Sequence, residues 1–515
     1  MLMTTFGSAV FGVEAITITI EVNWLLTGKS SQIVGLPDSA VKESFERIES
    51  TFKTNNFQFP RTKLVVNLAP ADIRKIGTAF DLPIALGILG ASEQFKNAIA
   101  ISKYVIMGEL ALDGTIRPIR GALPIAIGAF KEKFKGIIVP SVNAPEAALV
   151  KNLTVYGMEH ITQVIDFFEK GEKGTPFNSG DLNELLEIKQ GSSDIDFSEV
   201  KGQETIKRAL EIAAAGGHNA ILIGPPGAGK TMLAKRLPTI LPPLTIEEAL
   251  ETTKIHSVAG KLQTNSTLVS KRPFRYPHHT ISNFALVGGG GIPQPGEISL
   301  AHNGVLFLDE LPEFNKSALE SMRQPMEERK LTIARARQTA EFPASFMLIA
   351  SMNPCPCGFY NHPIKTCSCP PGAVHRYLNK ISGPLLDRID LHVEVTPVSY
   401  QEISMNTETE SSATIRNRVI TARNKQTKRF AEFQNINCNA QMSASLVRKI
   451  CSIDKVGASL LKNAMEKLNL SARAYERILK VARTIADLED SVEIKAEHLA
   501  EGIQFRSLDR EGWAG

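Results

Sequence analysis

No run of apolar residues in this sequence is long enough to cross a membrane as a helix. One of the most apolar runs, Leu82 to Ala91, falls well short of the ~18 residues that a bilayer span requires. The first residues, Met1 to Phe6, also lack the basic start and the apolar stretch of a signal peptide. We therefore expect a soluble, cytoplasmic protein without membrane contacts.

Cysteine and net charge are scarce as well. Six cysteines in 515 residues, without a secretion signal, favour a reducing compartment over a disulfide framework. The net charge of +4 neither requires nor excludes nucleic acid, so any argument for DNA binding must rest on local clusters. The length is sufficient for about three globular domains.

Patterns along the chain divide it into four parts. Residues 1–168 alternate strand-like and helix-like segments, for example the β-branched run 15–22, and predict an α+β domain. Residues 169–195 carry Gly, Ser and charged patches around one short helix and predict a linker. Residues 196–398 predict an α/β domain, and residues 399–515 predict helices followed by a C-terminal tail.

The strongest motif lies between the apolar strand 220–223 and a predicted helix over 232–237. It matches G-x-x-x-x-G-K-[ST], in which backbone N–H groups and a helix N-terminus bind phosphate. Lys230 is expected to reach the β and γ phosphates of ATP, and the Thr231 hydroxyl to bind Mg²⁺. The predicted nucleotide-binding residues are Gly224, Pro225, Pro226, Gly227, Ala228, Gly229, Lys230 and Thr231.

Two further strands end in polar residues that suit phosphoryl transfer. The apolar run 305–308 leads into Asp309 and Glu310, which are expected to hold Mg²⁺ and to activate the attacking water, respectively. The strand 346–352 ends at Asn353, whose amide is expected to hold that water near the γ-phosphate. A strand-end Asn that caps a turn is the alternative.

Two arginines are candidates for contacts with the transferred phosphate. Arg388 precedes the alternating strand 391–395 and is predicted to reach the γ-phosphate bound by a neighbouring subunit. The alternative is an ion pair of Arg388 with Asp387 or Asp390 within the chain. Arg473 opens a helix with apolar residues at helical spacing and is a second candidate, with an ordinary surface arginine as the alternative.

The chain resembles the ComM/YifB family of magnesium-chelatase-like AAA+ ATPases over nearly its full length. The resemblance rests on Arg275-Tyr276-Pro277-His278-His279-Thr280, Leu311-Pro312-Glu313-Phe314, Ala350-Ser351-Met352-Asn353-Pro354-Cys355-Pro356-Cys357-Gly358 and the stretch from Gly383 to Val395. It implies a P-loop AAA+ module, a parallel sheet with helices on both faces, followed by a helical lid. It also implies a homo-hexameric ring that uses ATP and Mg²⁺ and, for ComM, ATP-driven DNA branch migration in natural transformation.

The same resemblance implies that the N-terminal domain is similar to the Lon protease catalytic domain, with the ribosomal S5 domain 2-like fold. In our alignment Gly77 stands at the position of the Lon catalytic serine. The catalytic lysine falls at the apolar stretch from Leu123 to Ile125. Without a hydroxyl and an amine there is no nucleophile and no base, so we expect a scaffold without peptidase activity.

Four cysteines form two closely spaced pairs within residues 355–369, an insert in the α/β domain. Four thiolates on one short loop suit a closed tetrahedral zinc shell, which predicts a structural zinc ion. His362 or His375 in place of one thiolate, and reduced thiols without metal, are the alternatives. The predicted ligands are Cys355, Cys357, Cys367 and Cys369.

The best local candidate for DNA contacts is the basic stretch 329–338. By the family resemblance it forms a hairpin that projects into the pore of the ring. Arg335 and Arg337 would lie near its tip, where six copies would form a basic collar around the phosphates. The alternative is a solvated hairpin face.

The leading hypothesis is a hexameric ATPase that remodels DNA, with helicase-like or branch-migration activity. One rival is a metallation motor like the magnesium chelatase subunit. Against it, that motor lacks the Lon-like domain and the four-cysteine insert, so we expect no tetrapyrrole partner. The other rival is a protein-remodelling ATPase, without peptidase activity because the catalytic dyad is missing.

Overall fold

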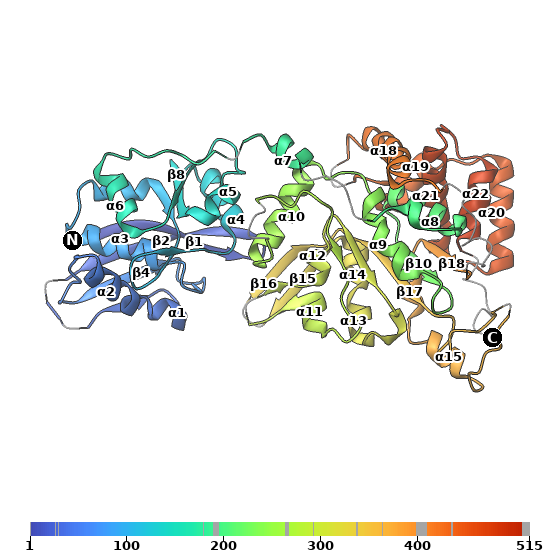
Figure 1. Cartoon of the computed structure of the whole chain (residues 1–515), viewed down its shortest axis with the longest axis horizontal. Coiled ribbons are helices and arrows are strands. Elements are labelled where there is room, and N and C mark those ends of the chain that lie inside the picture. Colours follow the sequence, from blue (N-terminus) through green and yellow to red (C-terminus); the bar gives the residue numbers. More distant parts are fainter. Residues whose placement is uncertain are drawn as a thin grey trace. The chain divides into compact units, whose positions relative to one another are not determined.

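The chain forms two compact units, which we describe separately (Figure 1). Unit 1 comprises Met1–Lys189, Thr245–Ser270 and Ala334–Glu341, and unit 2 comprises Gln190–Leu244, Lys271–Ile333 and Phe342–Gly515. A computed structural model describes residues 2–25, 27–28, 30–178, 180–188, 195–262, 267–291, 293–335, 338–362, 364–397, 409–433 and 436–506.

Unit 1 contains a mixed sheet of seven strands in the order β3-β4-β2-β1-β5-β8-β9. Its strands are β1 (Leu2–Phe11), β2 (Glu14–Trp24), β3 (Gln32–Val34), β4 (Leu64–Ala69), β5 (Tyr104–Ile106), β8 (Gly136–Pro140) and β9 (Thr154–Met158). β1, β2 and β4 pair antiparallel, whereas β5, β8 and β9 are parallel. The alternating run 15–22 lies in β2, where Ile18, Ile20 and Val22 are buried, so this strand prediction is confirmed.

The helices of unit 1 are α1 (Ser39–Lys42), α2 (Ser44–Thr54), α3 (Asp81–Ala91), α4 (Ala122–Lys131), α5 (Ala144–Ala147), α6 (Ile161–Glu169), α7 (Leu182–Ile188) and α10 (Ile246–Val258). A short ladder pairs β6 (Glu109–Leu110) with β7 (Ile116–Arg117). Helix α3 is buried along its whole length and forms the centre of the main core with β1, β2 and β4. The apolar run 82–91 is therefore core. In the described part of the chain no helix is both long and apolar enough to span a bilayer.

Helix α10 belongs to unit 1, although it follows the first helix of the P-loop motif in sequence. Thr245 and Glu248 form a capping box at its start. At its end the Ser257 hydroxyl donates to the buried carboxylate of Glu146, which also accepts from Leu123 N at 2.7 Å. Burial raises the pKa of Glu146 above its ordinary value, although these hydrogen bonds oppose the shift.

Unit 2 is built on a parallel sheet in the order β11-β14-β17-β10-β18. The strands are β10 (Ala220–Ile223), β11 (Phe274–Arg275), β14 (Val305–Leu308), β17 (Met347–Met352) and β18 (Leu391–Glu394). Every residue of β10, β14 and β17 is buried, so both faces of the sheet are covered. The predicted strands 220–223 and 305–308 have these bounds.

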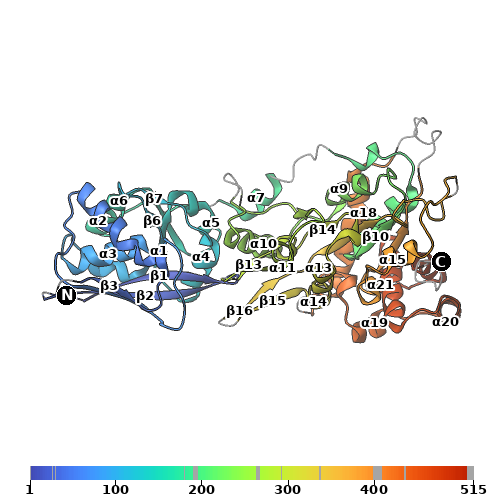
Figure 2. The same ribbon diagram turned by 90° about the horizontal axis from the view of Figure 1, so that it is seen from below.

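The helices around this sheet are α8 (Glu204–Gly216), α9 (Lys230–Ile240), α11 (Asn283–Val287), α12 (Glu297–Leu300), α13 (Lys316–Ser321), α14 (Arg323–Glu328), α15 (Ala373–Leu378) and α16 (Gly383–Leu386). There are two further small ladders. One pairs β12 (Gly288–Gly289) with β13 (Gln294–Pro295), and the other pairs β15 (Lys330–Arg335) with β16 (Gln338–Pro343), of which Ala334–Glu341 belongs to unit 1. Figure 2 shows β15 and β16 side by side, as the predicted hairpin requires.

Only helices follow the sheet in the described residues beyond 409. They are α18 (Ser412–Arg429), α19 (Ala444–Ile450), α20 (Lys455–Leu468), α21 (Ala472–Leu488) and α22 (Ala496–Gln504). α18 and α21 pack on α8 and α9 in the core of unit 2, while α19 to α22 share a core of their own. Unit 2 is therefore a parallel sheet followed by a helical subdomain.

Candidate active site and metal centre

The loop 224–231, here called the P-loop, joins β10 to α9 in a tight turn. Gly227 and Gly229 have φ angles of 80° and 82°, a region that L side chains rarely adopt. α9 begins at Lys230, and Gly229 before it has no side chain to cap the helix. The first N–H groups of α9 therefore face the turn, where they suit an anion.

Lys230 is the central cation of this site. Its Nζ donates to Gly224 O at 2.7 Å, to Pro225 O at 2.9 Å and to Asn353 Oδ1 at 3.0 Å. Burial lowers the pKa of Lys230, and the nearby charges of Asp309 and Glu310 act in the opposite direction. A bound phosphate would place a negative charge beside this partly buried ammonium group and stabilise its charged form.

Asp309 lies at the end of β14, opposite the P-loop. Its Oδ2 accepts from Thr231 Oγ1 at 2.7 Å and from the Tyr276 hydroxyl at 3.1 Å, and its Oδ1 accepts from Ser351. Burial alone would raise the pKa of Asp309, but these hydrogen bonds outweigh burial and hold it below the ordinary value. The carboxylate stays ionised at neutral pH, as a Mg²⁺ ligand must be.

Glu310 follows in a left-handed conformation with φ of 55°. Its side chain is 55% exposed, and its Oε2 lies 3.6 Å from His279 Nδ1. The ring of His278 packs at a tilt against the ring of His279, with centroids 4.1 Å apart. Glu310 is therefore open to solvent beside the P-loop, with one histidine next to its carboxylate.

The structure brings these predicted residues to one edge of the sheet. Ile223 pairs with Met352 and Leu308 pairs with Ala350, so Lys230, Asp309 and Asn353 all follow the carboxyl ends of neighbouring parallel strands. This is the edge at which α/β sheets bind ligands.

Arg388 lies at the other edge. β18 runs parallel to β10 with Ala220 opposite Leu391, so Arg388 precedes the start of the strand whose end adjoins the P-loop. At about 3.3 Å per residue, four residues of strand alone separate the two edges by about 10 Å. The guanidinium is buried, where Nη2 pairs with Glu327 at 2.7 Å and Nη1 donates to Pro384 O at 2.6 Å.

Arg473 also lies away from the P-loop of its own chain. It is exposed at the start of α21, and one turn later Arg477 forms an ion pair with Asp390. Asp390 is buried, which would raise its pKa, but Arg477 and His218 hold it below the ordinary value. Sequence reasoning offered Asp387 or Asp390 as a partner of Arg388, whereas the structure gives Glu327 to Arg388 and Arg477 to Asp390.

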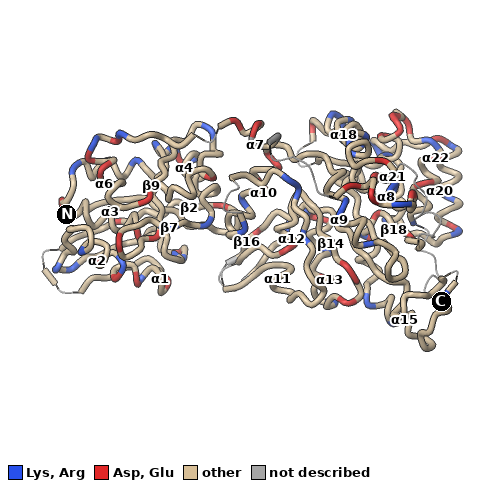
Figure 3. Tube along the Cα trace, viewed as in Figure 1, with Lys and Arg blue, Asp and Glu red and all other residues tan. Residues whose placement is uncertain are grey.

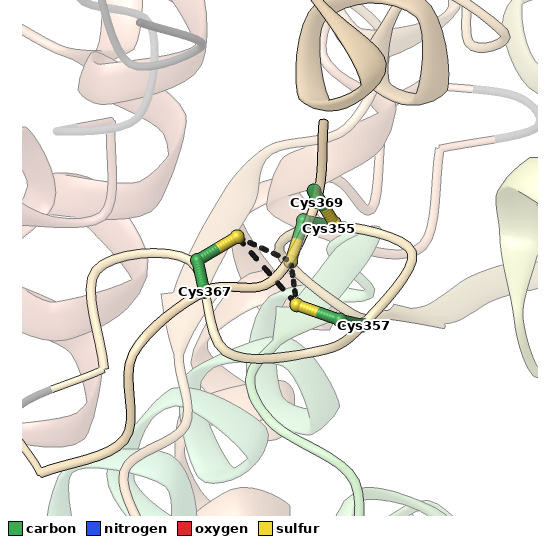
Figure 4. A group of neighbouring side chains, drawn as sticks. All are labelled: Cys355, Cys357, Cys367 and Cys369. Carbon is green, nitrogen blue, oxygen red and sulfur yellow. Dashed lines mark hydrogen bonds between the residues drawn. The ribbon is translucent and has the colours of Figure 1, made fainter. Parts of the chain in front are cut away.

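The four clustered cysteines converge on one point (Figure 4). Cys355 Sγ lies 3.3 Å from Cys357 Sγ and 3.7 Å from Cys367 Sγ, and the latter two lie 3.5 Å apart. All four sulfur atoms, that of Cys369 included, lie within 4.8 Å of one another. Tetrahedral zinc with Zn–S bonds of about 2.3 Å requires sulfur atoms about 3.8 Å apart, so the donor set fits this ion.

The two histidines that could replace a cysteine ligand form hydrogen bonds with other groups. His362 Nδ1 accepts from Ile364 N at 3.1 Å and Lys365 N at 2.9 Å, and His375 Nδ1 lies 2.9 Å from Asn379 Nδ2. Among the described residues, the cluster around the four sulfur atoms contains no histidine. The four cysteines are therefore the residues that could hold a metal ion here.

Comparison with known proteins identifies the family. A relative named Competence protein ComM, from Haemophilus influenzae, is 43% identical over 512 residues, which cover 99% of this chain and 98% of that protein. YifB of Escherichia coli is 44% identical over 511 residues, or 98% of this chain and 96% of YifB. This chain belongs to the ComM/YifB family.

Family models extend the match along this ComM/YifB chain. A model described as "Magnesium chelatase, subunit ChlI" matches residues 196–403, "Magnesium chelatase, subunit ChlI C-terminal" matches 409–506, and "Subunit ChlI of Mg-chelatase" matches 20–143. The chain is thus an AAA+-type ATPase, a class whose ligands are ATP and Mg²⁺, and Lys230, Thr231 and Asp309 suit both. Lon protease 2 of Bacillus subtilis is 32% identical over 159 residues, 28% of this chain and 27% of that protein.

Several residues of this ComM/YifB site were missed by sequence reasoning. Tyr276 and His279 contact Asp309 and Glu310, and both lie in a string that we used only to recognise the family. Ser351 is hidden inside an apolar strand. Glu327, the partner of Arg388, carries no signal in the sequence, because a glutamate on a helix is usually solvated.

The predicted DNA contacts are described only in part. The hairpin of β15 and β16 is present, but the side chain of Arg335 and all of Arg337 lie outside the described residues. Lys and Arg positions are interspersed with Asp and Glu positions in both units (Figure 3). The basic helix α18 is largely engaged within the chain: Arg418 pairs with Glu211, and Arg429 pairs with Asp487.

Proposed function

We propose that this chain is an ATP-hydrolysing AAA+ motor that works as a homo-hexameric ring on DNA. The observation that supports ATP hydrolysis is that the P-loop, Asp309 and Asn353 come together around Lys230. In this proposal Lys230 binds the β and γ phosphates, Thr231 and Asp309 hold Mg²⁺, Glu310 activates the attacking water and Asn353 orients it.

The position of Arg388 supports a ring. It lies at the sheet edge remote from its own P-loop, so it can reach a γ-phosphate only on another copy. Arg473 lies in the same region and is proposed to act on the same neighbouring site. Because Arg388 is paired with Glu327 in the single chain, a neighbouring nucleotide would have to compete with that carboxylate.

DNA is the proposed substrate of the ring. In this proposal the hairpin of β15 and β16 projects into the pore of the ring, as the family resemblance implies, and Arg335 and Arg337 of six copies contact the phosphates. The Haemophilus relative is named a competence protein, and it matches this chain along nearly its whole length. A metallation motor is the second candidate, because the family models carry the magnesium chelatase name.

The N-terminal region, residues 1–168, is proposed to be a Lon-like scaffold, joined by the linker 169–195 to the ATPase core 196–398 and the lid 399–515. Gly77 has no hydroxyl group. Leu123 is buried, and its backbone N–H donates a hydrogen bond to the carboxylate of Glu146. Lys75 and Thr78 flank Gly77, but Lys75 donates to Pro70 O and Thr78 donates to Glu109. These two groups do not form a dyad, which supports a domain without peptidase activity.

The cysteine cluster is proposed to hold one structural zinc ion, because a closed shell of four thiolates leaves no open position for chemistry. Metal analysis of the purified protein tests this directly. We expect about one zinc per chain, and less than about half a zinc per chain contradicts the proposal.

The function is tested by ATPase rates with and without single-stranded or forked DNA at low salt. We expect DNA to stimulate the wild type and the control Arg61→Ala/Lys151→Ala, which removes two exposed basic residues of unit 1. Stimulation should vanish in Arg335→Ala/Arg337→Ala while basal turnover remains. Absence of DNA binding contradicts the DNA part, and absence of nucleotide binding or of oligomers with ATP contradicts the motor itself.

A further inference from the structure

The loop that carries the four cysteines rests against the P-loop. This cysteine loop, residues 355–369, starts two residues after Asn353. At Gly358 a Cβ atom would lie 2.4 Å from Pro226 Cδ, so no side chain fits between the two loops. The close approach of Gly358 is a packing contact between the predicted metal centre and the phosphate-binding turn.

The two loops also line one small cavity of about 60 Å³. Gly224 and Pro225 line it from the P-loop, and Gly358, Tyr360 and His362 line it from the cysteine loop. Gly224 and Pro225 are the residues whose carbonyl groups accept from Lys230. A displacement of the cysteine loop therefore removes support from the carbonyl groups that position Lys230.

A second connection runs through the backbone. Asn353 bonds to Lys230, and Cys355 lies only two residues further along the chain. Cys355 is buried, and its sulfur accepts from Tyr360 N at 3.3 Å. One short peptide thus carries the Lys230 partner, a metal ligand and the glycine that touches Pro226.

Regular structure does not hold this peptide in place. In the described residues no helix or strand lies between the end of β17 at Met352 and the start of α15 at Ala373. A metal that joins Cys355 to Cys369 would close this loop and restrict its conformations. A bound metal would therefore fix the position of the loop.

We propose that the metal bound by the four cysteines controls nucleotide binding, because it holds the cysteine loop against the P-loop. This inference rests on the proposed nucleotide site and zinc site, and it goes beyond a structural role for the metal. With zinc bound, Gly358 supports Pro226 and Asn353 is held on Lys230. Without zinc, the P-loop loses this support and binds nucleotide more weakly.

The first test separates the metal from the nucleotide. The affinity for mant-ADP, a fluorescent ADP analogue, is measured on the full chain with magnesium in excess. The samples are wild type, wild type after a zinc-selective chelator, the same sample after zinc is restored, and Cys367→Ser. Cys367 is chosen because it lies on the other arm of the loop from Cys355 (Figure 4). We expect about tenfold weaker binding without zinc, restored by added zinc, a range typical of coupling between two sites.

The second test changes the contact and leaves the ligands intact. Gly358→Ala adds a methyl group against Pro226, whereas Gly372→Ala adds one where nothing lies within 4 Å. Both glycines have positive φ, 84° and 74°, so the backbone strain of the two substitutions is matched. We expect both variants to keep one zinc per chain and only Gly358→Ala to lose mant-ADP affinity, about tenfold.

The outcomes distinguish the inference from what it rests on. If the chelated protein and Cys367→Ser stay folded, by circular dichroism, and bind mant-ADP as the wild type does, the coupling is overturned and the nucleotide site stands. Equal affinities of Gly358→Ala and Gly372→Ala also overturn it. A wild type that binds no mant-ADP at all refutes the proposed function instead, and a wild type without zinc refutes the metal centre and the inference together.

Discussion

At the scale of single residues, the groups proposed to bind nucleotide and the group proposed to activate water differ in how firmly they are held. Lys230 and Thr231 are held by bonds to Gly224, Pro225 and Asp309, so their positions are set before any ligand binds. Glu310 is different, because its carboxylate is 55% exposed and lies beside His279. A general base needs such access to water.

Glu310→Gln should therefore separate binding from turnover. We expect ATP to be retained with an affinity near that of the wild type, while the ATPase rate falls about 100-fold or more, the usual loss when a general base is removed. Equilibrium binding and steady-state ATPase assays measure the two quantities. Glu313→Gln is the matched control, since Glu313 lies three residues away and pairs with Lys380. Normal turnover in Glu310→Gln would refute the assigned base.

His279→Ala tests the neighbour of that base. His279 Nδ1 lies 3.6 Å from Glu310 Oε2, so we expect its loss to lower kcat about tenfold and to leave nucleotide affinity unchanged. His278→Ala is the control, because His278 packs against His279 but directs its Nδ1 to Thr280 Oγ1 at 2.9 Å. Equal losses in both variants would show that the segment matters only for folding, and the positioning role would be abandoned.

At the scale of elements, the residue at which a helix begins matters more for the site than the length of the helix. α9 begins at Lys230, two residues before the predicted start, and this places the lysine in the first helical turn. In unit 1, Asp38 caps α1, and the chain divides at Glu43 into α1 and α2.

The segment after α6 makes the stability of the fold depend on pH. Glu172 follows α6, and its carboxylate bonds to Lys103, Lys135 and the Tyr104 hydroxyl around β5 and β8. Desolvation would raise its pKa, but these partners outweigh desolvation and lower it from 4.5 to about 2. A folded-state pKa below the unfolded value means that this group stabilises the fold above pH 4.5 and that the gain is lost as the pH falls towards 2.

We expect Glu172→Gln to lower the Tm at pH 7 and to differ less and less from the wild type as the pH is reduced to about 3. Thermal unfolding followed by circular dichroism at several pH values measures this difference. Glu132→Gln, at an exposed position, should leave the Tm nearly unchanged throughout. A constant difference between Glu172→Gln and wild type across this pH range would show that the ion pairs contribute nothing.

At the scale of the whole molecule, the sheet of unit 2 supports the proposal that one chain alone does not form a complete active site. The P-loop follows the end of β10, while Arg388 precedes β18, the parallel neighbour of β10. Because Arg388 and the P-loop lie at opposite edges of one sheet, an arginine of one copy can meet only the phosphate site of another copy. The proposed ring follows from this geometry, because a head-to-tail contact repeated around an axis joins each Arg388 to the next P-loop.

Mixing of two inactive variants tests this arrangement. Lys230→Ala removes the phosphate site but keeps Arg388, and Arg388→Ala keeps the phosphate site but lacks the arginine. Each variant alone should have little ATPase activity, whereas mixed assemblies should regain part of it at interfaces that combine both intact halves. Mixing Lys230→Ala with Glu310→Gln is the control, since both changes fall in the same half of the interface. Failure of the first mixture, with mixed oligomers shown to form, would contradict a site shared between subunits.

The sequence by itself determined what depends on local order. The P-loop, the acidic pair after β14 and the two pairs of cysteines are each contiguous, and the strands 220–223 and 305–308 are marked by uninterrupted apolar residues. These signals predicted the parallel sheet and the edge at which Lys230, Asp309 and Asn353 meet. They sufficed because parallel strands present their carboxyl ends on one side.

Only the tertiary structure decided which distant residues touch. Tyr276 donates to Asp309 and Arg388 pairs with Glu327. Gly358 packs on Pro226, which is more than a hundred positions away in the sequence. Periodicity and spacing report which face of an element is apolar, and carry no information about which loop lies beside it. The contacts that surround the nucleotide site, and that connect it to the cysteines, arise from packing of elements that are far apart in the chain.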